Sequence, residues 1–202
     1  MAKPTLTQDQ LYEAGIGAFF RPQDLDVLGI PFYDLQQLVA EGVAERVARG
    51  LYRLTDAEPS EHYSLAAVCA RAPNAIVCLL SALRYHDIGT QLPRDIWIAI
   101  PRRSRAPRVE GFPIRLVRFS GPSLSYGVEE IRLENVPVKL TTPARTVVDC
   151  FRFRRLVGRD VALEALRTAI QEHKASADEI WRAAEVCRAK SLVGPALEVL
   201  AL

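Results

Sequence analysis

The segment from Leu35 to Leu54, LQQLVAEGVAERVARGLYRL, limits the possible fold more than any other part of the chain. Leu35, Leu38 and Val39 fall on one helical face, and the glutamines between them fall on others. Gly42 follows where the C-terminus of a helix favours a residue that tolerates positive φ. This part of the segment predicts a short amphipathic helix that ends at a glycine.

The residues after Gly42 predict a β-hairpin. Residues 43–47 and 51–54 alternate in the manner of strands, and Arg49-Gly50 lies at the expected turn. Two further helices are predicted upstream, over Thr7–Ala14 and Arg21–Leu28, with the third helix over 32–41. Three helices followed by a hairpin predict a winged helix-turn-helix, a unit that usually places one helix in the major groove of DNA.

The chain divides at a polar, proline-bearing linker over residues 55–60. We expect a winged helix-turn-helix DNA-binding domain over residues 1–55. A second, C-terminal domain is expected over 60–202. The predicted fold class is α+β: the winged unit, then a mixed α/β domain with a small sheet and a helical C-terminus.

The C-terminal domain contains both strand and helix patterns. A helix is predicted over 61–71, and residues 75–86 begin extended before turning helical around Ser81. Strands are predicted in four segments, at 95–100, 113–119, 129–133 and 136–140. Helical patterns follow at 142–156, 160–173, 176–189 and in a final stretch to residue 202. The strands therefore come first and the helices cover the end of the chain.

Composition excludes several classes of protein. No apolar stretch approaches the roughly 18–20 residues needed to span a bilayer, and the first ten residues lack the apolar core of a signal peptide. The four cysteines are scattered in apolar contexts with no CxxC pair or Cys/His cluster, which predicts buried, reduced thiols: Cys69, Cys78, Cys150 and Cys187. We expect a cytoplasmic protein with no metal and no cofactor.

The distribution of charge is more informative than the net value of +2. Residues 1–58 contain five basic and nine acidic side chains, a net charge of −4, and the remainder carries +6. The predicted DNA-binding domain is therefore the acidic part. Three of its five cations, Arg46, Arg49 and Arg53, nevertheless fall on the hairpin, where a phosphate backbone would pass.

Three motifs, in order along the chain, resemble the AbiEi-type antitoxins, transcriptional regulators of abortive-infection toxin–antitoxin systems. Residues 49–54, RGLYRL, are similar to the family's "RG-x-Y" wing. Ser81-Ala82-Leu83 with His86, Gln91 and Pro93 resembles its "SAL…H…Q-x-P" segment, with Asp87 where the family often has glycine. Residues 141–149, TTPARTVVD, are similar to its "T-x-P-x-R-T-x-x-D" helix start.

The resemblance implies a DNA-binding repressor of its own operon and an antitoxin that counteracts a nucleotidyltransferase-like toxin, directly or indirectly. It makes residues 60–202 the C-terminal antitoxin or interaction domain. The expected partners are an operator with inverted repeats and that toxin, with no membrane. A monomer in solution that assembles on DNA is compatible with this arrangement. The alternative is an interaction protein that does not read DNA and whose basic C-terminal surface binds a protein or an RNA.

Seven side chains are the candidates for DNA contact. On the third helix Gln can pair bidentately with adenine and Tyr can reach a phosphate oxygen, whereas the wing arginines suit phosphate or the minor groove. If two protomers each placed the three arginines on phosphates, counterion release would give a salt slope of about −5. The alternative is a solvated helix face in a winged domain that contacts protein instead, with an exposed ribbon whose charges serve solubility. The candidates are Tyr33, Asp34, Gln36, Gln37, Arg46, Arg49 and Arg53.

A second basic surface is predicted beyond the linker. The segment Pro101–Arg108 contains four arginines between two predicted strands, and the second strand adds two more. This surface is expected either to extend a DNA footprint, to meet an acidic protein or RNA, or to be a solvated loop. Its members are Arg102, Arg103, Arg105, Arg108, Arg115 and Arg118.

No set of residues predicts catalysis. Ser81 and His86 are five apart, about 140° around a helix, and no nucleophile elbow surrounds the serine. Arg145 and Asp149 form an i,i+4 pair of the kind that stabilises a helix. The arginines between Arg152 and Arg159 suit the C-terminus of a helix. The protein is therefore expected not to be an enzyme.

Overall fold

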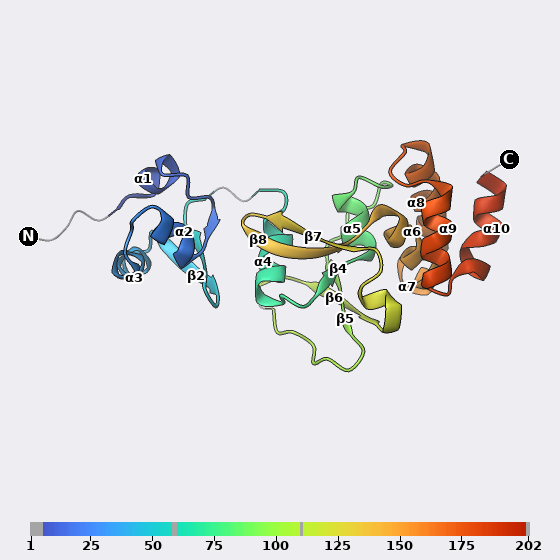
Figure 1. The fold of residues 1–202 in the computed structure, drawn as a ribbon, viewed down its shortest axis with the longest axis horizontal. Coiled ribbons are helices and arrows are strands. Elements are labelled where there is room, and N and C mark those ends of the chain that lie inside the picture. The colour runs from blue at the N-terminus through green and yellow to red at the C-terminus, as the bar shows by residue number, and fades with distance from the viewer. Residues whose placement is uncertain (1–5, 58–59, 110, 201–202) are drawn as a thin grey trace, which may run out of the picture. The chain divides into compact units, whose positions relative to one another are not determined.

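The computed structural model describes residues 6–57, 60–109 and 111–200 (Figure 1). The chain forms two compact units. Unit 1 comprises Met1–Pro73 together with Arg132–Val138, and unit 2 comprises Asn74–Ile131 and Lys139–Leu202. Two residues of the predicted linker, Glu58 and Pro59, and the predicted end of the last helix at Leu202 lie outside the described residues.

Unit 1 begins with the elements of a winged helix. Its three-stranded sheet has the order β1-β3-β2, with both pairings antiparallel. The elements are α1 (Gln8–Glu13), β1 (Phe19–Phe20), α2 (Pro22–Val27), α3 (Phe32–Ala40), β2 (Ala44–Ala48) and β3 (Leu51–Leu54), followed by α4 (Tyr63–Arg71). The three helices and the hairpin predicted from the sequence are all present.

Local chemistry fixes the ends of these helices. Thr7 caps α1 in a capping box with Gln10, and Pro22 occupies the first turn of α2. The helices then pack on the sheet through one apolar cluster in which every buried side chain is at most 4% exposed, made up of Leu11, Ile16, Phe20, Leu25, Leu35, Leu38, Ala44, Leu54 and Ala57. Short helices like these are stabilised by this packing more than by their own propensity.

Two predictions for this unit are wrong in detail. Val39, expected on the buried face of α3, is 37% exposed, because only Leu35 and Leu38 reach the core. The strands of the hairpin do not alternate strictly: the β2–β3 register shifts between Arg46 and Ala48, so Val47 is buried although it follows two exposed side chains. A bulge of this kind inserts an extra residue and reverses the side-chain alternation.

Unit 2 is built on a five-stranded sheet of order β6-β5-β4-β8-β7, whose hairpin tip, Arg132–Val138, is grouped with unit 1. β4 pairs antiparallel with β5 and parallel with β8, and β5 pairs parallel with β6. The strands are β4 (Ile76–Val77), β5 (Ile96–Pro101), β6 (Ile114–Phe119), β7 (Val128–Leu133) and β8 (Val136–Thr141). The small sheet predicted for the C-terminal domain is present, and the structure shows that it combines parallel and antiparallel pairs.

Helices make up the remainder of unit 2. They are α5 (Leu79–Tyr85), the 3₁₀ turn η1 (Gly121–Leu124), α6 (Pro143–Arg152), α7 (Arg154–Val157), α8 (Arg159–Gln171), α9 (Ala177–Val186) and α10 (Lys190–Leu200). The prediction of one continuous helix over 142–156 is wrong. It breaks at Phe153, so that α7 is a separate short helix before Gly158, whose φ is 101°.

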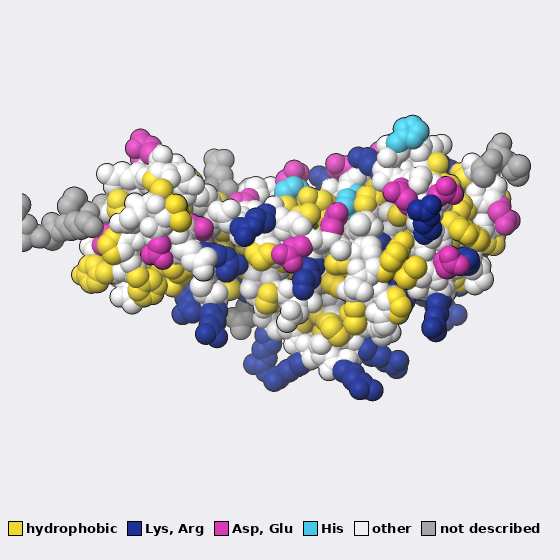
Figure 2. All heavy atoms as spheres, viewed as in Figure 1, with side chains coloured by type: hydrophobic (Ala, Val, Ile, Leu, Met, Phe, Trp, Pro, Cys, Tyr) yellow, Lys and Arg dark blue, Asp and Glu magenta, His cyan; other side chains and the backbone are white. Residues whose placement is uncertain are grey.

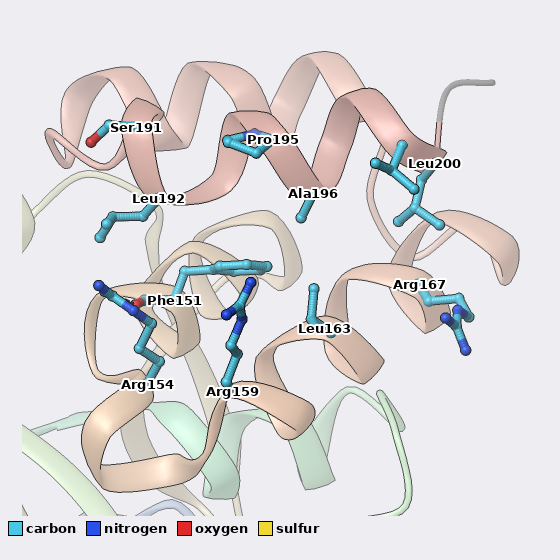
Figure 3. A pocket seen from close by; sticks show the side chains of 11 residues that line it. Phe151, Arg154, Arg159, Leu163, Arg167, Ser191, Leu192, Pro195, Ala196 and Leu200 are labelled. Atoms are coloured by element: carbon cyan, nitrogen blue, oxygen red, sulfur yellow. Dashed lines mark hydrogen bonds between the residues drawn. The ribbon is translucent and has the colours of Figure 1, made fainter.

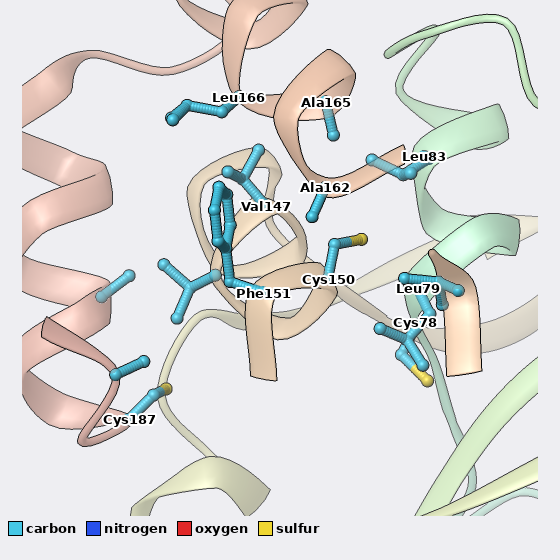
Figure 4. Packing of buried hydrophobic residues seen from close by; sticks show 14 of the residues in the cluster. Cys78, Leu79, Leu83, Val147, Cys150, Phe151, Ala162, Ala165, Leu166 and Cys187 are labelled. Atoms are coloured by element: carbon cyan, nitrogen blue, oxygen red, sulfur yellow. The ribbon is translucent and has the colours of Figure 1, made fainter. Parts of the chain in front are cut away.

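The core of unit 2 is centred on α6. Figure 4 shows Val147, Cys150 and Phe151 of α6 between side chains of α8 and side chains of α5. All four cysteines are buried free thiols, as their apolar contexts predicted. Burial raises the pKa of the Cys69 thiol to about 12. These thiols are therefore structural.

Among the residues that the structure describes, no helix is both long and apolar enough to cross a membrane.

Candidate nucleic-acid interface

Helix α3 is held on unit 1 by two leucines and presents its other side chains to solvent. Leu35 and Leu38 are each 1% exposed, and they fix the rotation of the helix. Tyr33 is 71% exposed and Gln36 is exposed, whereas Asp34 in the first turn is half-buried. This rotation directs polar and aromatic side chains outward from α3, as a DNA-reading helix requires.

Gln37 differs from Gln36 in its contacts. Its side-chain amide donates a hydrogen bond of 2.9 Å to the Glu41 carboxylate one turn later. This pair leaves Gln36 as the glutamine of α3 whose described surroundings contain no hydrogen-bond partner.

The hairpin β2–β3 carries two exposed cations. Ala48 pairs with Leu51, so Arg49 and Gly50 form the turn, and Gly50 has a φ of 67°. Arg46 and Arg49 are both exposed, and no ion pair joins either guanidinium to a carboxylate within residues 6–57, 60–109 and 111–200. Both are available for phosphate.

Arg53, the third predicted wing cation, is already engaged inside unit 1. Its guanidinium contacts Glu45 at 3.2 Å, donates 2.8 Å to the Ala57 carbonyl and lies 4.9 Å from the centre of the Tyr63 ring. Its side chain is only 17% exposed. Arg53 therefore ties the hairpin to the segment that follows it, and two of the three predicted wing cations are free to contact a ligand.

Several large apolar side chains of unit 1 are also exposed. They gather at the end of α2 and on α3, where Figure 2 shows hydrophobic surface near the N-terminal end of the molecule. A contiguous patch of this kind marks an interaction site more often than an inert surface. Its members are Val27, Leu28, Phe32, Tyr33 and Val39.

The loop between β5 and β6 in unit 2 is strongly basic. Its four arginines, Arg102, Arg103, Arg105 and Arg108, are all exposed, and Figure 2 shows dark-blue side chains clustered over this loop. The two strand arginines that sequence reasoning added have structural contacts. Arg115 forms an ion pair of 2.6 Å with Asp95, and Arg118 donates to the carbonyls of loop residues, including Pro101 at 3.2 Å. Arg118 thus shapes the loop.

The segment TTPARTVVD forms a buried polar network at the start of α6. Arg145 is 0% exposed; it contacts Asp149 at 2.9 Å and donates to the carbonyls of Ser123 and Tyr126 at 3.0 and 2.5 Å. Asp149 also accepts 2.7 Å from Arg152. Burial raises the pKa of the Asp149 carboxyl, and the two guanidiniums oppose that effect. The network anchors the loop over residues 121–127 to α6.

Ser81 and His86 have separate structural partners. The Ser81 hydroxyl accepts 2.8 Å from the backbone amide of Trp97, and His86 Nε2 lies 2.7 Å from the Thr141 carbonyl. Because a carbonyl only accepts, His86 carries its proton on Nε2. Burial lowers the pKa of His86 despite this hydrogen bond. Neither side chain is oriented by the other.

A groove of about 550 Å³ lies in unit 2 between α8 and α10 (Figure 3). Arg159, Leu163 and Arg167 are spaced four apart along one face of α8, and Figure 3 shows Arg159 extending toward the Phe151 ring. Apolar side chains of α10, among them Pro195 and Val199, form the opposite wall. Within the described residues no group of three or more His, Cys, Asp or Glu side chains is arranged to hold a metal ion.

The arrangement of α1, α2, α3 and the β1-β3-β2 sheet defines the class of unit 1: it is a winged helix-turn-helix. Residues 9–55 match the family model described as a transcriptional regulator, AbiEi antitoxin, so the suspected resemblance is confirmed for this segment. That family is one of regulatory antitoxins.

Comparison of whole structures gives the fold of a larger part of the chain. The crystal structure of the Rv2827c protein from Mycobacterium tuberculosis superposes with a TM-score of 0.50 at 14% identity, over 83% of this chain. The match covers 66% of that protein, so this chain spans slightly less than two thirds of its length. No curated protein matches the sequence.

Sequence reasoning did not identify two features of these surfaces. The α8–α10 groove joins segments about 30 residues apart, and the sequence does not indicate that Arg159 and Arg167 of α8 line a groove with α10. The exposure of Phe32 and Val39 was missed because apolar residues at helical spacing read as core. The helix has more large apolar side chains than the two leucines that its core face buries, and comparing these numbers would have indicated that some of them are exposed.

Proposed function

We propose that the protein is a DNA-binding repressor and antitoxin that autoregulates its own promoter and counteracts a nucleotidyltransferase-like toxin. The family match over residues 9–55 supports the regulatory role. Unit 1 would supply DNA recognition and unit 2 the antitoxin function, with no catalytic step by this chain. A cytoplasmic location follows from binding the chromosome.

One observation carries the DNA-binding part of this proposal: α3 exposes Tyr33 and Gln36 while the adjacent wing exposes two cations, Arg46 and Arg49. A helix that presents hydrogen-bonding side chains beside a cationic hairpin combines base reading with phosphate positioning. The acidic balance of residues 1–58 argues that these few contacts act on two neighbouring half-sites of an inverted repeat, occupied by two protomers.

The β5–β6 loop supports a longer footprint. Four exposed arginines on one loop form a local positive potential suited to a phosphate backbone. We assign phosphate contacts to Arg102, Arg103, Arg105 and Arg108, and structural roles to Arg115 and Arg118. The loop adds affinity without adding sequence preference.

Gel shifts against the upstream region of the gene test the proposal. We expect binding at low salt by the wild type and loss of binding by Arg46→Ala/Arg49→Ala. Arg155→Ala, an exposed arginine of α7, is the matched control and should bind normally. Absence of a wild-type shift, or a shift unchanged in the double variant, contradicts DNA binding through the wing.

Co-expression tests the antitoxin part. The full chain should restore growth to cells that express the product of a neighbouring nucleotidyltransferase gene. The double variant Arg46→Ala/Arg49→Ala should still restore growth, since neither residue belongs to unit 2. Failure of the wild-type chain to rescue would refute the antitoxin assignment and leave the DNA result standing.

The α8–α10 groove favours a second candidate function, binding of an acidic amphipathic helix from a partner protein. Arg159 and Arg167 lie about 12 Å apart along α8, with Leu163 between them. No ion pair engages either guanidinium among the described residues. Carboxylates two turns apart around an apolar side chain would complement this wall. Arg159→Glu/Arg167→Glu should abolish rescue in co-expression while leaving gel shifts intact; unaffected rescue rules the groove out as the antitoxin surface.

A further inference from the structure

The exposed face of α3 lacks the side chains that read guanine. Its sequence, FYDLQQLVA, contains no Lys or Arg. Arginine and lysine make the commonest specific contact to guanine, through O6 and N7 in the major groove. Asp34 is of the type that accepts from the N4 amino group of cytosine, but it lies half-buried at the start of the helix. The glutamines are then the α3 side chains with a bidentate fit to a base, and that base is adenine.

The side chains that α3 does expose suit adenine and thymine. Gln36 can donate to N7 and accept from the N6 amino group of adenine in a bidentate pair. Phe32, which is 52% exposed, and the exposed Ala40 lie one turn to either side of Gln36 on the same helical face. Apolar groups in the major groove contact the C5-methyl group of thymine, which cytosine lacks.

The contacts of the other polar side chains of α3 leave Gln36 as the residue best placed to hydrogen-bond with a base. Gln37 is bonded to Glu41, and Asp34 is half-buried at the start of the helix. Gln36 stands between the two apolar side chains with its amide unbonded in the described structure. In this arrangement the thymine methyl groups would bury the exposed apolar area on α3, which would otherwise face water.

We infer that the operator half-site read by α3 is composed of A·T base pairs, with Gln36 reading an adenine and Phe32 and Ala40 contacting flanking thymine methyl groups. The inference rests on the proposed DNA-binding function of unit 1. It goes further because it assigns the base pair and the specificity-determining side chain. The wing arginines contribute affinity that does not depend on sequence.

Selection of full-length protein on random DNA duplexes tests the inference without knowledge of the natural operator. We expect enriched half-sites with A·T pairs at their centre. In the selected duplex, replacement of each contacted thymine by deoxyuridine removes only the C5-methyl group and should weaken binding roughly fourfold. Substitution of the contacted A·T pair by G·C should weaken it roughly 5- to 150-fold.

Variants at position 36 provide the sharper test. Gln36→Ala should abolish discrimination between adenine and guanine at one position, and Gln36→Arg should shift the preference there to guanine. Gln36 is exposed, so both variants should fold; Gln171→Ala, an exposed glutamine of α8, is the matched control and should leave specificity unchanged.

The outcomes separate the two proposals. Half-sites with G·C at the centre, or binding that is insensitive to deoxyuridine and to Gln36→Ala, overturn the A·T inference while DNA binding stands. Failure to enrich any duplex at low salt overturns the proposed DNA-binding function and this inference with it.

Discussion

Removal of the Asp149 carboxylate should severely destabilise unit 2. Arg145 would then retain its charge at 0% exposure without a carboxylate, held by the carbonyls of Ser123 and Tyr126 and by the Phe119 ring 4.9 Å away. Breaking a buried ion pair from one side costs about 3–5 kcal/mol, because the remaining charge has no counter-ion. A loss of that size is a large fraction of the about 5–15 kcal/mol that stabilises a typical domain.

The assay is urea unfolding followed by tryptophan fluorescence, because both tryptophans, Trp97 and Trp181, lie in unit 2. Asp149→Ala should lower the free energy of unfolding by about 3–5 kcal/mol. Replacing both partners, in Arg145→Met/Asp149→Leu, should recover most of that loss, since the fully buried charge is removed. Arg152 also loses Asp149, but its side chain is 24% exposed and reaches solvent.

The control is the exposed pair of Arg115 and Asp95, whose atoms are 2.6 Å apart at the surface. Asp95→Ala should cost at most about 1 kcal/mol. An Asp149→Ala protein that unfolds within about 1 kcal/mol of the wild type would refute the reasoning. So would a double variant that is as unstable as the single one.

Three further predictions follow from the same contacts. With Arg53 engaged, two protomers bring four exposed wing cations to DNA, so the wing should contribute about −4 to the salt slope of binding, in addition to any contribution of the β5–β6 loop. Arg49→Ala should make the measured slope shallower by about 2 in titrations of the affinity against salt, and a slope unaffected by Arg49→Ala contradicts the assignment. The free energy of unfolding should fall as the pH drops below 6.5, because His86 in the unfolded state then gains a proton, whereas folded His86, with its lowered pKa, takes it up only at lower pH. His86→Gln should flatten this pH dependence in urea titrations, and a pH profile unchanged by His86→Gln counts against the prediction. A Cβ at Gly127 would meet Arg145 Cβ at 2.7 Å, whereas a Cβ at Gly121 would meet nothing within 4 Å. Gly127→Ala should therefore lower the free energy of unfolding by about 1–3 kcal/mol more than Gly121→Ala does in urea unfolding, and equal losses of stability exclude the clash.

The order of the elements follows from the sequence because local signals determine it. Apolar spacing, Thr7 as a helix cap and glycine stops predicted the helices and the hairpin of unit 1 in chain order. The strands of unit 2 were predicted from their β-branched content. Pairing was not predictable: β4 lies between β5 and β8, and nothing local to Ile76–Val77 encodes its partners.

Side-chain roles were less predictable because long-range contacts determine them. Arg53 looks like a free wing cation in the sequence, yet Tyr63 and the Ala57 carbonyl engage it. Arg145 looks like one half of a surface helix pair, yet the loop over residues 121–127 buries it completely. The Tyr63 ring and the Ser123 carbonyl are brought to these arginines by folding, and sequence spacing does not report such contacts.

A DNase I footprint of the full-length protein on the upstream region of its own gene tests the central claim most directly. The account predicts two protected half-sites about one helical turn apart, where two protomers each insert α3, and loss of both in Arg46→Ala/Arg49→Ala. A protein that folds normally and leaves the upstream region unprotected at low salt would contradict it.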